Sequence, residues 1–186
     1  MRGLRLNLYS TAAGRDVKRI DDAFTAQAAI AGTMGWHVEV IAMSEVLVGA
    51  ADVLTRSPVP VVIDHYGLHG DASPQSERGR RLIDLFALPN IWIKLSAPYR
   101  VSPNTMETRP DRDWLAAILK VAPGRCVWGS DWPHAPPHAL HADANTALPY
   151  RALSYESLVD HFVAAIGDAT LAQAVMVDDP ARLYEF

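Results

Sequence analysis

Short apolar runs rich in β-branched residues alternate along this chain with longer stretches of helical character. The runs lie at 3–8, 37–41, 61–65, 91–96 and 126–132. Helical stretches follow them, among them the alanine-rich segment 17–34 and segment 44–54, where apolar residues recur about every 3.6 positions. Strand–helix–strand order calls for parallel strands joined by right-handed crossovers. The sequence therefore predicts an α/β fold that forms a single domain over residues 1–186.

Length and charge exclude several classes of protein. At 186 residues the chain can bury a sizeable core, but it is shorter than most complete (β/α)₈ barrels. Its net charge of −4, with acids and bases interspersed, provides no basic stripe for nucleic acid. No apolar run reaches membrane-spanning length, and the one cysteine, Cys126, permits no internal disulfide. We expect a cytoplasmic protein that binds neither nucleic acid nor a membrane.

Polar residues recur on one face of the predicted strands or at their carboxyl ends. Because strand side chains alternate between faces, the apolar residues of most runs point to one side. The residues left for the interior side of a parallel barrel are Arg5 and Asn7, His37 and Glu39, Lys94 and Ser96, and Asp131. His65 ends the third run. Unpaired buried charge is costly, so these residues predict a wet mouth at the carboxyl ends of the strands. An open doubly wound sheet with ordinary polar strand ends is the alternative.

Five segments resemble the amidohydrolase-2 family, and most closely its 2-pyrone-4,6-dicarboxylate hydrolases and related lactonases. They are 3–8 (GLRLNL), 62–67 (VIDHYG), 93–100 (IKLSAPYR), 128–134 (WGSDWPH) and 179–184 (DPARLY). The resemblance runs from Gly3 to the C-terminus and implies a partial (β/α)₈ TIM barrel whose strands match four to eight of the family. Strands one to three, with the His-x-His pair of strand one, are absent. We therefore expect a fragment or split-gene product, or an assembly that is a homo-oligomer or contains a complementing chain.

The resemblance assigns two catalytic residues. Asp131 matches the aspartate that takes a proton from the attacking water, and His65 matches a histidine that faces the site. Guanidinium groups match carboxylates with two parallel hydrogen bonds, so arginines suit a small carboxylated substrate. The predicted substrate-binding residues are Arg5, Asn7, His37, Lys94, Ser96, Tyr99, Arg100 and His134.

These assignments predict a hydrolase that opens a lactone or ester-like bond with Asp-activated water. Many members of the family use zinc or manganese, whereas those that act on pyrone dicarboxylates resemble metal-independent enzymes. Without the His-x-His pair, only His65 and Asp131 remain as candidate ligands, too few for a metal site. His134, His138 and His141 resemble a ligand cluster only in spacing, because Pro133, Pro136 and Pro137 disfavour a helix there. An inactive partial barrel that serves as a binding or assembly module, or a decarboxylase of the same superfamily, is the alternative.

Overall fold

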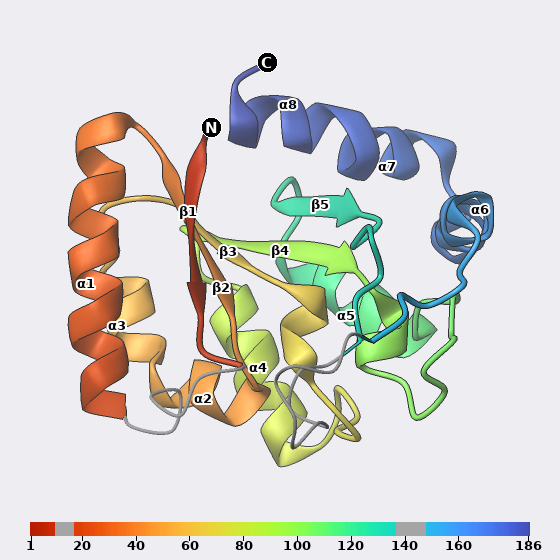
Figure 1. The fold of residues 1–186 in the computed structure, drawn as a ribbon, viewed down its shortest axis with the longest axis horizontal. Helices are drawn as coiled ribbons and strands as arrows, with labels where there is room; N and C mark the ends of the chain where they lie inside the picture. Colours follow the sequence, from red (N-terminus) through yellow and green to blue (C-terminus); the bar gives the residue numbers. More distant parts are fainter. Residues whose placement is uncertain (10–16, 137–147) are drawn as a thin grey trace.

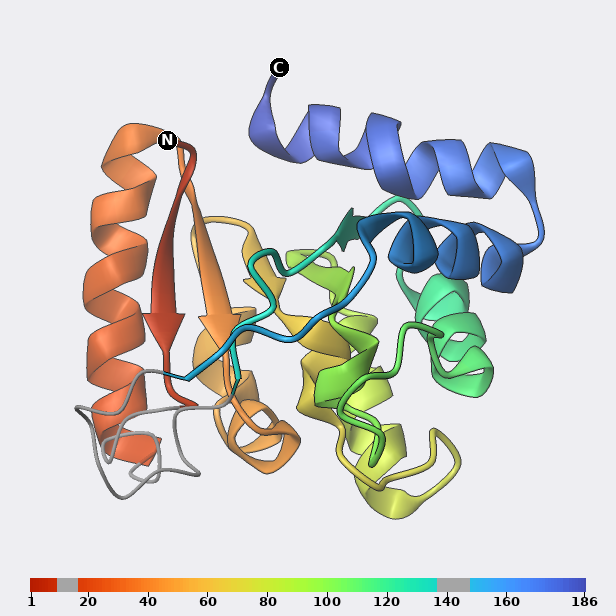
Figure 2. The same ribbon diagram turned by 45° about the vertical axis from the view of Figure 1, so that its right-hand side comes forward.

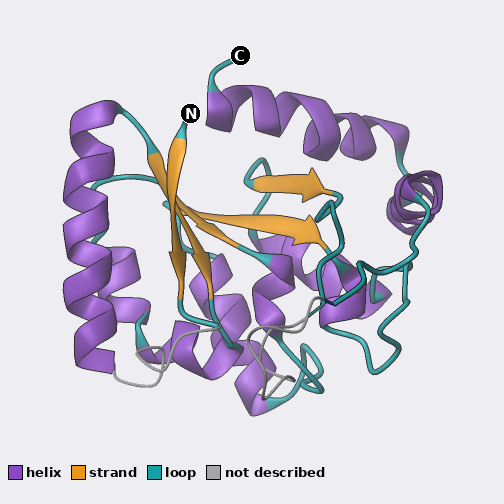
Figure 3. Ribbon diagram, viewed as in Figure 1, coloured by secondary structure: helices purple, strands orange, loops and turns teal. Residues whose placement is uncertain are grey.

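The computed structural model describes residues 1–9, 17–136 and 148–186. Its sheet contains five parallel strands that neighbour each other in chain order. They are β1 (Gly3–Asn7), β2 (His37–Ile41), β3 (Val61–Ile63), β4 (Ile91–Ser96) and β5 (Cys126–Gly129). Each strand begins where the apolar runs predict. Strands β1, β3 and β5 end earlier than predicted, because turns that carry polar residues follow them (Figure 3).

Helices follow the strands in the predicted alternation. They are α1 (Val17–Met34), α2 (Ser44–Gly49), α3 (Ala51–Thr55), α4 (Glu77–Phe86), α5 (Arg112–Val121), α6 (Tyr155–Ile166), α7 (Ala169–Gln173) and α8 (Asp179–Tyr184), with a π-helical turn at Ala174–Asp178. The segment predicted as one helix at 44–54 forms two, α2 and α3, which meet at Ala50. Side-chain oxygens accept backbone N–H groups at the starts of four helices, and these caps fix where the helices begin: Ser76, Asp111, Ser154 and Asp168.

The main hydrophobic core lies between the sheet and the helices on its outer face. Val61, Ile63, Ile91 and Ile93 are fully buried there because alternate residues of β3 and β4 point outward. Helix α1 packs on β1 and β2, α4 packs on β4, and α8 packs on β5. Figures 1 and 2 show α1 alongside β1 and β2 from two directions.

The inner face of the sheet carries a smaller apolar cluster. It contains Val62, Trp92 and Val127, against which Leu183 of α8 packs. Most of the other side chains on this face are polar, as the alternation of side chains predicts, although Ile41 of β2 is apolar. None of the described helices combines the length and the apolar character needed to cross a lipid bilayer.

The order and direction of the strands confirm the predicted α/β class. Within the described residues β1 pairs only with β2 and β5 only with β4, so the sheet has two edges. The carboxyl ends of the strands carry the turns that shape the site.

Candidate active site

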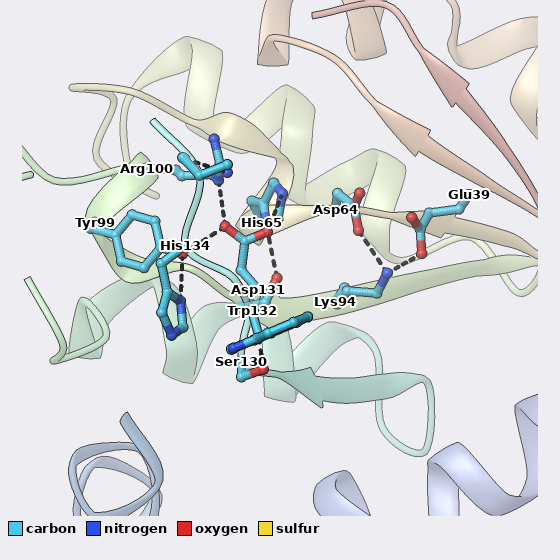
Figure 4. Close-up of polar contacts among 12 residues, drawn as sticks. Glu39, Asp64, His65, Lys94, Tyr99, Arg100, Ser130, Asp131, Trp132 and His134 are labelled. Carbon is cyan, nitrogen blue, oxygen red and sulfur yellow. Dashed lines mark hydrogen bonds and ion pairs between the residues drawn. The ribbon is translucent and has the colours of Figure 1, made fainter. Parts of the chain in front are cut away.

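Three turns after successive strands bring polar side chains to one place. His65 follows β3, Tyr99 and Arg100 lie in the 3₁₀ turn Pro98–Arg100 after β4, and Asp131 follows β5. Left-handed backbone conformations bend the chain in each turn, with φ of 52° at His65, 53° at Ala97 and 59° at Asp131. Figure 4 shows the His65, Tyr99 and Arg100 side chains around the Asp131 carboxylate.

Within the part of the chain that the structure describes, hydrogen-bond donors hold only one oxygen of the Asp131 carboxylate. Its Oδ2 accepts a hydrogen bond from the Tyr99 hydroxyl at 2.6 Å and another from Arg100 Nε at 2.8 Å. Its Oδ1 lies 3.7 Å from His65 Nε2, beyond hydrogen-bond distance. The Asp131 side chain is 15% exposed, so water reaches it. One oxygen is thus fixed by donors while the other faces the histidine.

His65 is a buried, neutral histidine. Its Nδ1 lies 2.8 Å from Ser96 Oγ, and its side chain is 2% exposed. Burial lowers the pKa of His65 to about 4, although Asp64 and Asp131 act in the opposite direction. The imidazole therefore carries no charge at neutral pH, and the Ser96 contact sets the orientation of its ring.

A cavity of about 230 Å³ opens beside this group. The strand ends contribute much of its lining, namely Arg5, Asn7, Tyr9, Ile41, His65, Arg100 and Asp131. The loop after β5 contributes Trp132, Pro133, Ala135 and Pro136. The cavity therefore contains both predicted catalytic residues and three of the predicted substrate-binding residues, and its volume suits a small molecule.

A second polar group, the inner-face cluster, consists of Arg5, Glu39, Asp64 and Lys94. Arg5 Nε lies 2.8 Å from Glu39 Oε1, and Arg5 Nη2 bonds to Asp64. Lys94 Nζ lies 2.9 Å from Asp64 Oδ1 and also bonds to Glu39, as Figure 4 shows. Burial alone would lower the pKa of Lys94, but Asp64 and Glu39 outweigh it and the pKa is raised. Two cations and two carboxylates thus satisfy each other.

Asp64 is the residue that strand parity should have revealed. The run predicted at 61–65 treats His65 as part of the strand, on the same face as Val61 and Ile63. The strand β3 ends at Ile63, so this prediction made it too long. Val62 is the inward residue of β3, since it pairs in register with Trp92 of β4, which belongs to the inner face. Counting two positions on from Val62 gives Asp64. His65 reaches the cavity through the turn, not through the alternation of the strand.

The remaining predicted contacts divide between the cavity and other places. Asn7 lines the cavity, and Ser96 contacts His65. Lys94 belongs to the inner-face cluster, as an ion pair with a neighbouring acid. His37 begins β2, at the far end of that strand from the cavity, where it is buried against Tyr184 at 5.4 Å between ring centroids. The structure therefore does not bring His37 to the cavity.

His134 contacts Tyr99 and is not among the residues that line the cavity. Its Nδ1 is 3.3 Å from the Tyr99 hydroxyl, and burial lowers its pKa. His138 and His141 lie outside the described residues.

Arg151 is a residue that sequence reasoning missed. It lies outside all five motif segments and carries no local signal. Its guanidinium lies 4.7 Å from the centroid of the Tyr99 ring and donates to the carbonyl oxygens of Ala135 and Thr105. Only the fold brings it to the site.

Curated relatives of this chain are lactone hydrolases. The chain is 28% identical over 155 residues to 4-sulfomuconolactone hydrolase of Rhizobium radiobacter, a match that covers 81% of this chain and 48% of that protein. It is 30% identical over 200 aligned positions to 2-pyrone-4,6-dicarboxylate hydrolase of Comamonas testosteroni, covering 99% and 59%. The chain thus spans about half the length of the curated relatives it matches.

Solved structures show the same fold. A probable 2-pyrone-4,6-dicarboxylic acid hydrolase from Acinetobacter baumannii, crystallised with citric acid, matches at 22% identity with a TM-score of 0.68 and covers 100% of this chain and 65% of its own. An amidohydrolase from Burkholderia multivorans with bound zinc matches at 24% identity with a TM-score of 0.72 and the same coverage. These likenesses confirm the predicted partial barrel.

The zinc bound to one of these relatives raises the question of which ligands the described residues offer to such an ion. Protein zinc sites use three or four ligands, whereas no three His, Cys, Asp or Glu side chains of the described residues converge on one point. His65 and Asp131 are close, but Arg100 already bonds to the Asp131 carboxylate. The donor set of the described residues therefore does not fit zinc, and we assign no metal-dependent step to it.

The sequence as a whole decides the family. The family model described as Amidohydrolase matches residues 1–186, the whole of this chain. The resemblance carried by the five segments is thereby confirmed. This chain belongs to the amidohydrolase family.

Proposed function

We propose that this chain carries the water-activating part of a hydrolase that opens a lactone ring in a small carboxylated compound. The observation that carries the proposal is the Asp131 carboxylate, whose Oδ2 is held by Tyr99 and Arg100 while Oδ1 is left toward His65. The names of the curated relatives support the lactone as the substrate class.

Asp131 is the proposed base. A general base must accept the proton of the nucleophile from within hydrogen-bond reach. A water molecule that donates to Asp131 Oδ1 would lie in the cavity, beside His65. As its oxygen bonds to the lactone carbonyl carbon, one proton passes to Oδ1. The tetrahedral intermediate then collapses, the ring C–O bond breaks, and the proton on Asp131 passes to the leaving oxygen. The product carries a hydroxyl group and a carboxylic acid, which releases its proton to water at neutral pH.

His65 is the proposed positioning partner of that water. Because burial lowers its pKa to about 4, the ring is neutral at pH 7 and keeps one N–H and one bare nitrogen. Nδ1 contacts Ser96, so Nε2 is the atom that faces Asp131 and the cavity. A neutral ring can orient the water or the substrate carbonyl through Nε2.

Arg5 and Arg100 are the proposed anchors for the substrate's carboxylate groups. Both line the cavity, and both already bond to acids of the chain. A guanidinium carries five N–H donors, more than their contacts within the described residues use, so each can also donate to an anion. Because both arginines are paired with acids, the cavity carries little net positive charge. Hydrogen-bond geometry, more than charge, would therefore select the substrate.

The test compares purified wild-type chain with Asp131→Asn on 2-pyrone-4,6-dicarboxylate and on 4-sulfomuconolactone. We expect ring opening by the wild type and a fall in kcat of about 10²- to 10⁴-fold in the variant. Asp84→Asn, an exposed change on α4, is the matched control and should keep full activity. A folded wild type that binds these anions without hydrolysis would overturn the hydrolase in favour of a binding module.

The two sheet edges lead to a second, separate proposal. Unpaired N–H and C=O groups on edge strands favour pairing with another chain. We propose that β1 and β5 are covered by association, with a second copy or with a complementing chain. Size-exclusion chromatography coupled to light scattering should give a mass above that of one chain. A stable monomer would refute self-association.

A further inference from the structure

Tyr99 is a buried tyrosine whose hydroxyl points at the proposed base. The residue is 2% exposed, and its hydroxyl donates to Asp131 Oδ2 at 2.6 Å. Burial, and then Asp131, raise the pKa of Tyr99, so the phenol keeps its proton and remains a donor. Since that proton is committed to Asp131, the contact of the hydroxyl with His134 Nδ1 at 3.3 Å requires the histidine to donate. Tyr99 thus links His134 to one oxygen of the carboxylate.

Arg151 lies over the Tyr99 ring. Its guanidinium lies 4.7 Å from the ring centroid, within the range of a cation–π contact. Arg151 Nη1 donates to the carbonyl oxygen of Ala135 at 2.5 Å, and Nε donates to that of Thr105 at 2.9 Å. One side chain therefore ties together the loops that follow β4 and β5, and Ala135 is part of the cavity wall.

A purely structural tyrosine would not need this arrangement. A phenylalanine would fill the same ring volume and make the same stacking contact, and it would avoid the cost of burying a hydroxyl. What the hydroxyl adds is a contact with His134 and a hydrogen bond to the Asp131 carboxylate, and hydrogen bonds to carboxylates are among the stronger kinds in proteins. The bond also fixes which oxygen of Asp131 is engaged, because both donors, Tyr99 and Arg100, meet at Oδ2.

We propose that Tyr99 is a positioning residue that aims Asp131 Oδ1 at the attacking water, and that Arg151 supports it by holding the ring and the cavity wall. The inference rests on the proposed function. It assigns different effects to the two residues. Loss of the Tyr99 hydroxyl should impair the chemical step alone, whereas loss of Arg151 should also disturb substrate binding.

The first experiment is Tyr99→Phe, with Tyr155→Phe as the matched control. Tyr155 is half exposed and packs its ring on Trp128, away from the cavity lining. We expect Tyr99→Phe to lower kcat about 10-fold and to change KM less than about 2-fold, because the lost bond acts on the base and not on bound substrate. Tyr155→Phe should leave both unchanged. An unchanged kcat in Tyr99→Phe would overturn the proposal.

A double-mutant cycle separates positioning from a loss of fold. If Tyr99 acts through Asp131, Tyr99→Phe should change the residual kcat less than about 2-fold when Asp131 is already alanine. A structural role would cost the same factor in both backgrounds, and that result would refute the proposal. The same cycle in urea unfolding needs no activity. The midpoint shift caused by Tyr99→Phe should shrink when Asp131 is alanine.

Arg151→Met tests the support. The substitution keeps an apolar stem but removes the donors to Ala135 and Thr105, so we expect kcat to fall and KM to rise together. Arg112→Met, an exposed change at the start of α5, is the control. If Arg151→Met lowers kcat with an unchanged KM, the role given to the cavity wall is wrong. If the wild type hydrolyses no lactone, the proposed function fails separately, and the unfolding cycle still decides whether Tyr99 and Asp131 are coupled.

Discussion

Two groups of polar side chains use the same chemistry in different ways. The cavity group consists of His65, Tyr99, Arg100 and Asp131, and the inner-face cluster consists of Arg5, Glu39, Asp64 and Lys94. Both combine carboxylates with guanidinium or ammonium groups at the carboxyl half of one sheet. In the inner-face cluster Arg5 and Lys94 each bond to both Glu39 and Asp64. In the cavity group, Asp131 has two donors on one oxygen and none within hydrogen-bond distance among the described residues on the other.

The difference shows how one sheet separates structure from chemistry. A closed network of charges leaves no carboxylate oxygen for a substrate or water, and breaking it exposes a buried charge. A carboxylate held on one side keeps its orientation and still has an oxygen for proton transfer. We therefore expect changes at Glu39, Asp64 and Lys94 to act mainly on stability, and changes in the cavity group to act mainly on activity. Arg5 belongs to the inner-face cluster and also lines the cavity, so its loss should affect both.

The largest expected effect on stability comes from Lys94→Met. Removing the ammonium group leaves the fully buried Asp64 and the largely buried Glu39 short of a partner, so the free energy of unfolding should fall by about 3–5 kcal/mol. Asp131→Asn should change it by about 1 kcal/mol or less, because amide and carboxylate have the same shape and the site is open to water. Urea denaturation measures both. Lys120→Met, exposed on α5, is the control. A larger loss from Asp131→Asn than from Lys94→Met would break the comparison.

Acid should separate the two regions next. Burial lowers the pKa of His65 from 6.5 to about 4, so the unfolded chain binds a proton that the folded chain refuses in this interval. The free energy of unfolding should therefore decrease as the pH is lowered from 6.5 to 4, by about 3 kcal/mol for this residue. The His65→Gln variant should lose that much less over the same range.

Asp64 in the inner-face cluster also loses its contribution as the pH falls, but in a lower pH range than His65. Burial alone would raise its pKa, but Lys94, His65 and Arg5 together lower it below 3.8. Its contribution is therefore complete above pH 3.8 and is lost only as pH falls further. Unfolding of wild type and His65→Gln, followed by circular dichroism across this range, checks the order. Identical pH profiles for the two proteins would contradict it.

The smallest effect expected within the inner-face cluster is that of Glu39→Gln. The amide still accepts a hydrogen bond but loses the charge that attracts Arg5 and Lys94, so we expect the free energy of unfolding to fall by about 1–2 kcal/mol. Glu45→Gln removes an exposed pair with Arg78 and should cost about 0.5 kcal/mol or less. Thermal unfolding compares the two. Equal shifts would mean that the inner-face cluster contributes no more than a surface ion pair.

Strand periodicity predicted the class of fold and much of the site, because it is a local property. Arg5, Lys94 and Ser96 lie on the inner face as alternation requires, and Asp131 follows β5. The alternation failed for His65, which lies in the turn after β3, and taking His65 as the inward residue of that run hid Asp64. It also gave no depth along a strand, so His37 was grouped with residues at the other end. The link between Tyr99 and Arg151 joins residues 52 positions apart in number, and no local pattern predicts such a contact.

The left-handed backbone of the turns has a consequence for laboratory evolution of this chain. His65, Ala97, Asp131 and His134 all have φ between 52° and 62°, where β-branched side chains are strongly disfavoured. β-Branched substitutions at these four positions should lower the free energy of unfolding by about 1–2 kcal/mol, with glycine and asparagine tolerated best. New specificities would instead arise at Tyr9, Trp132 and Ala135, which line the cavity and do not have a positive φ.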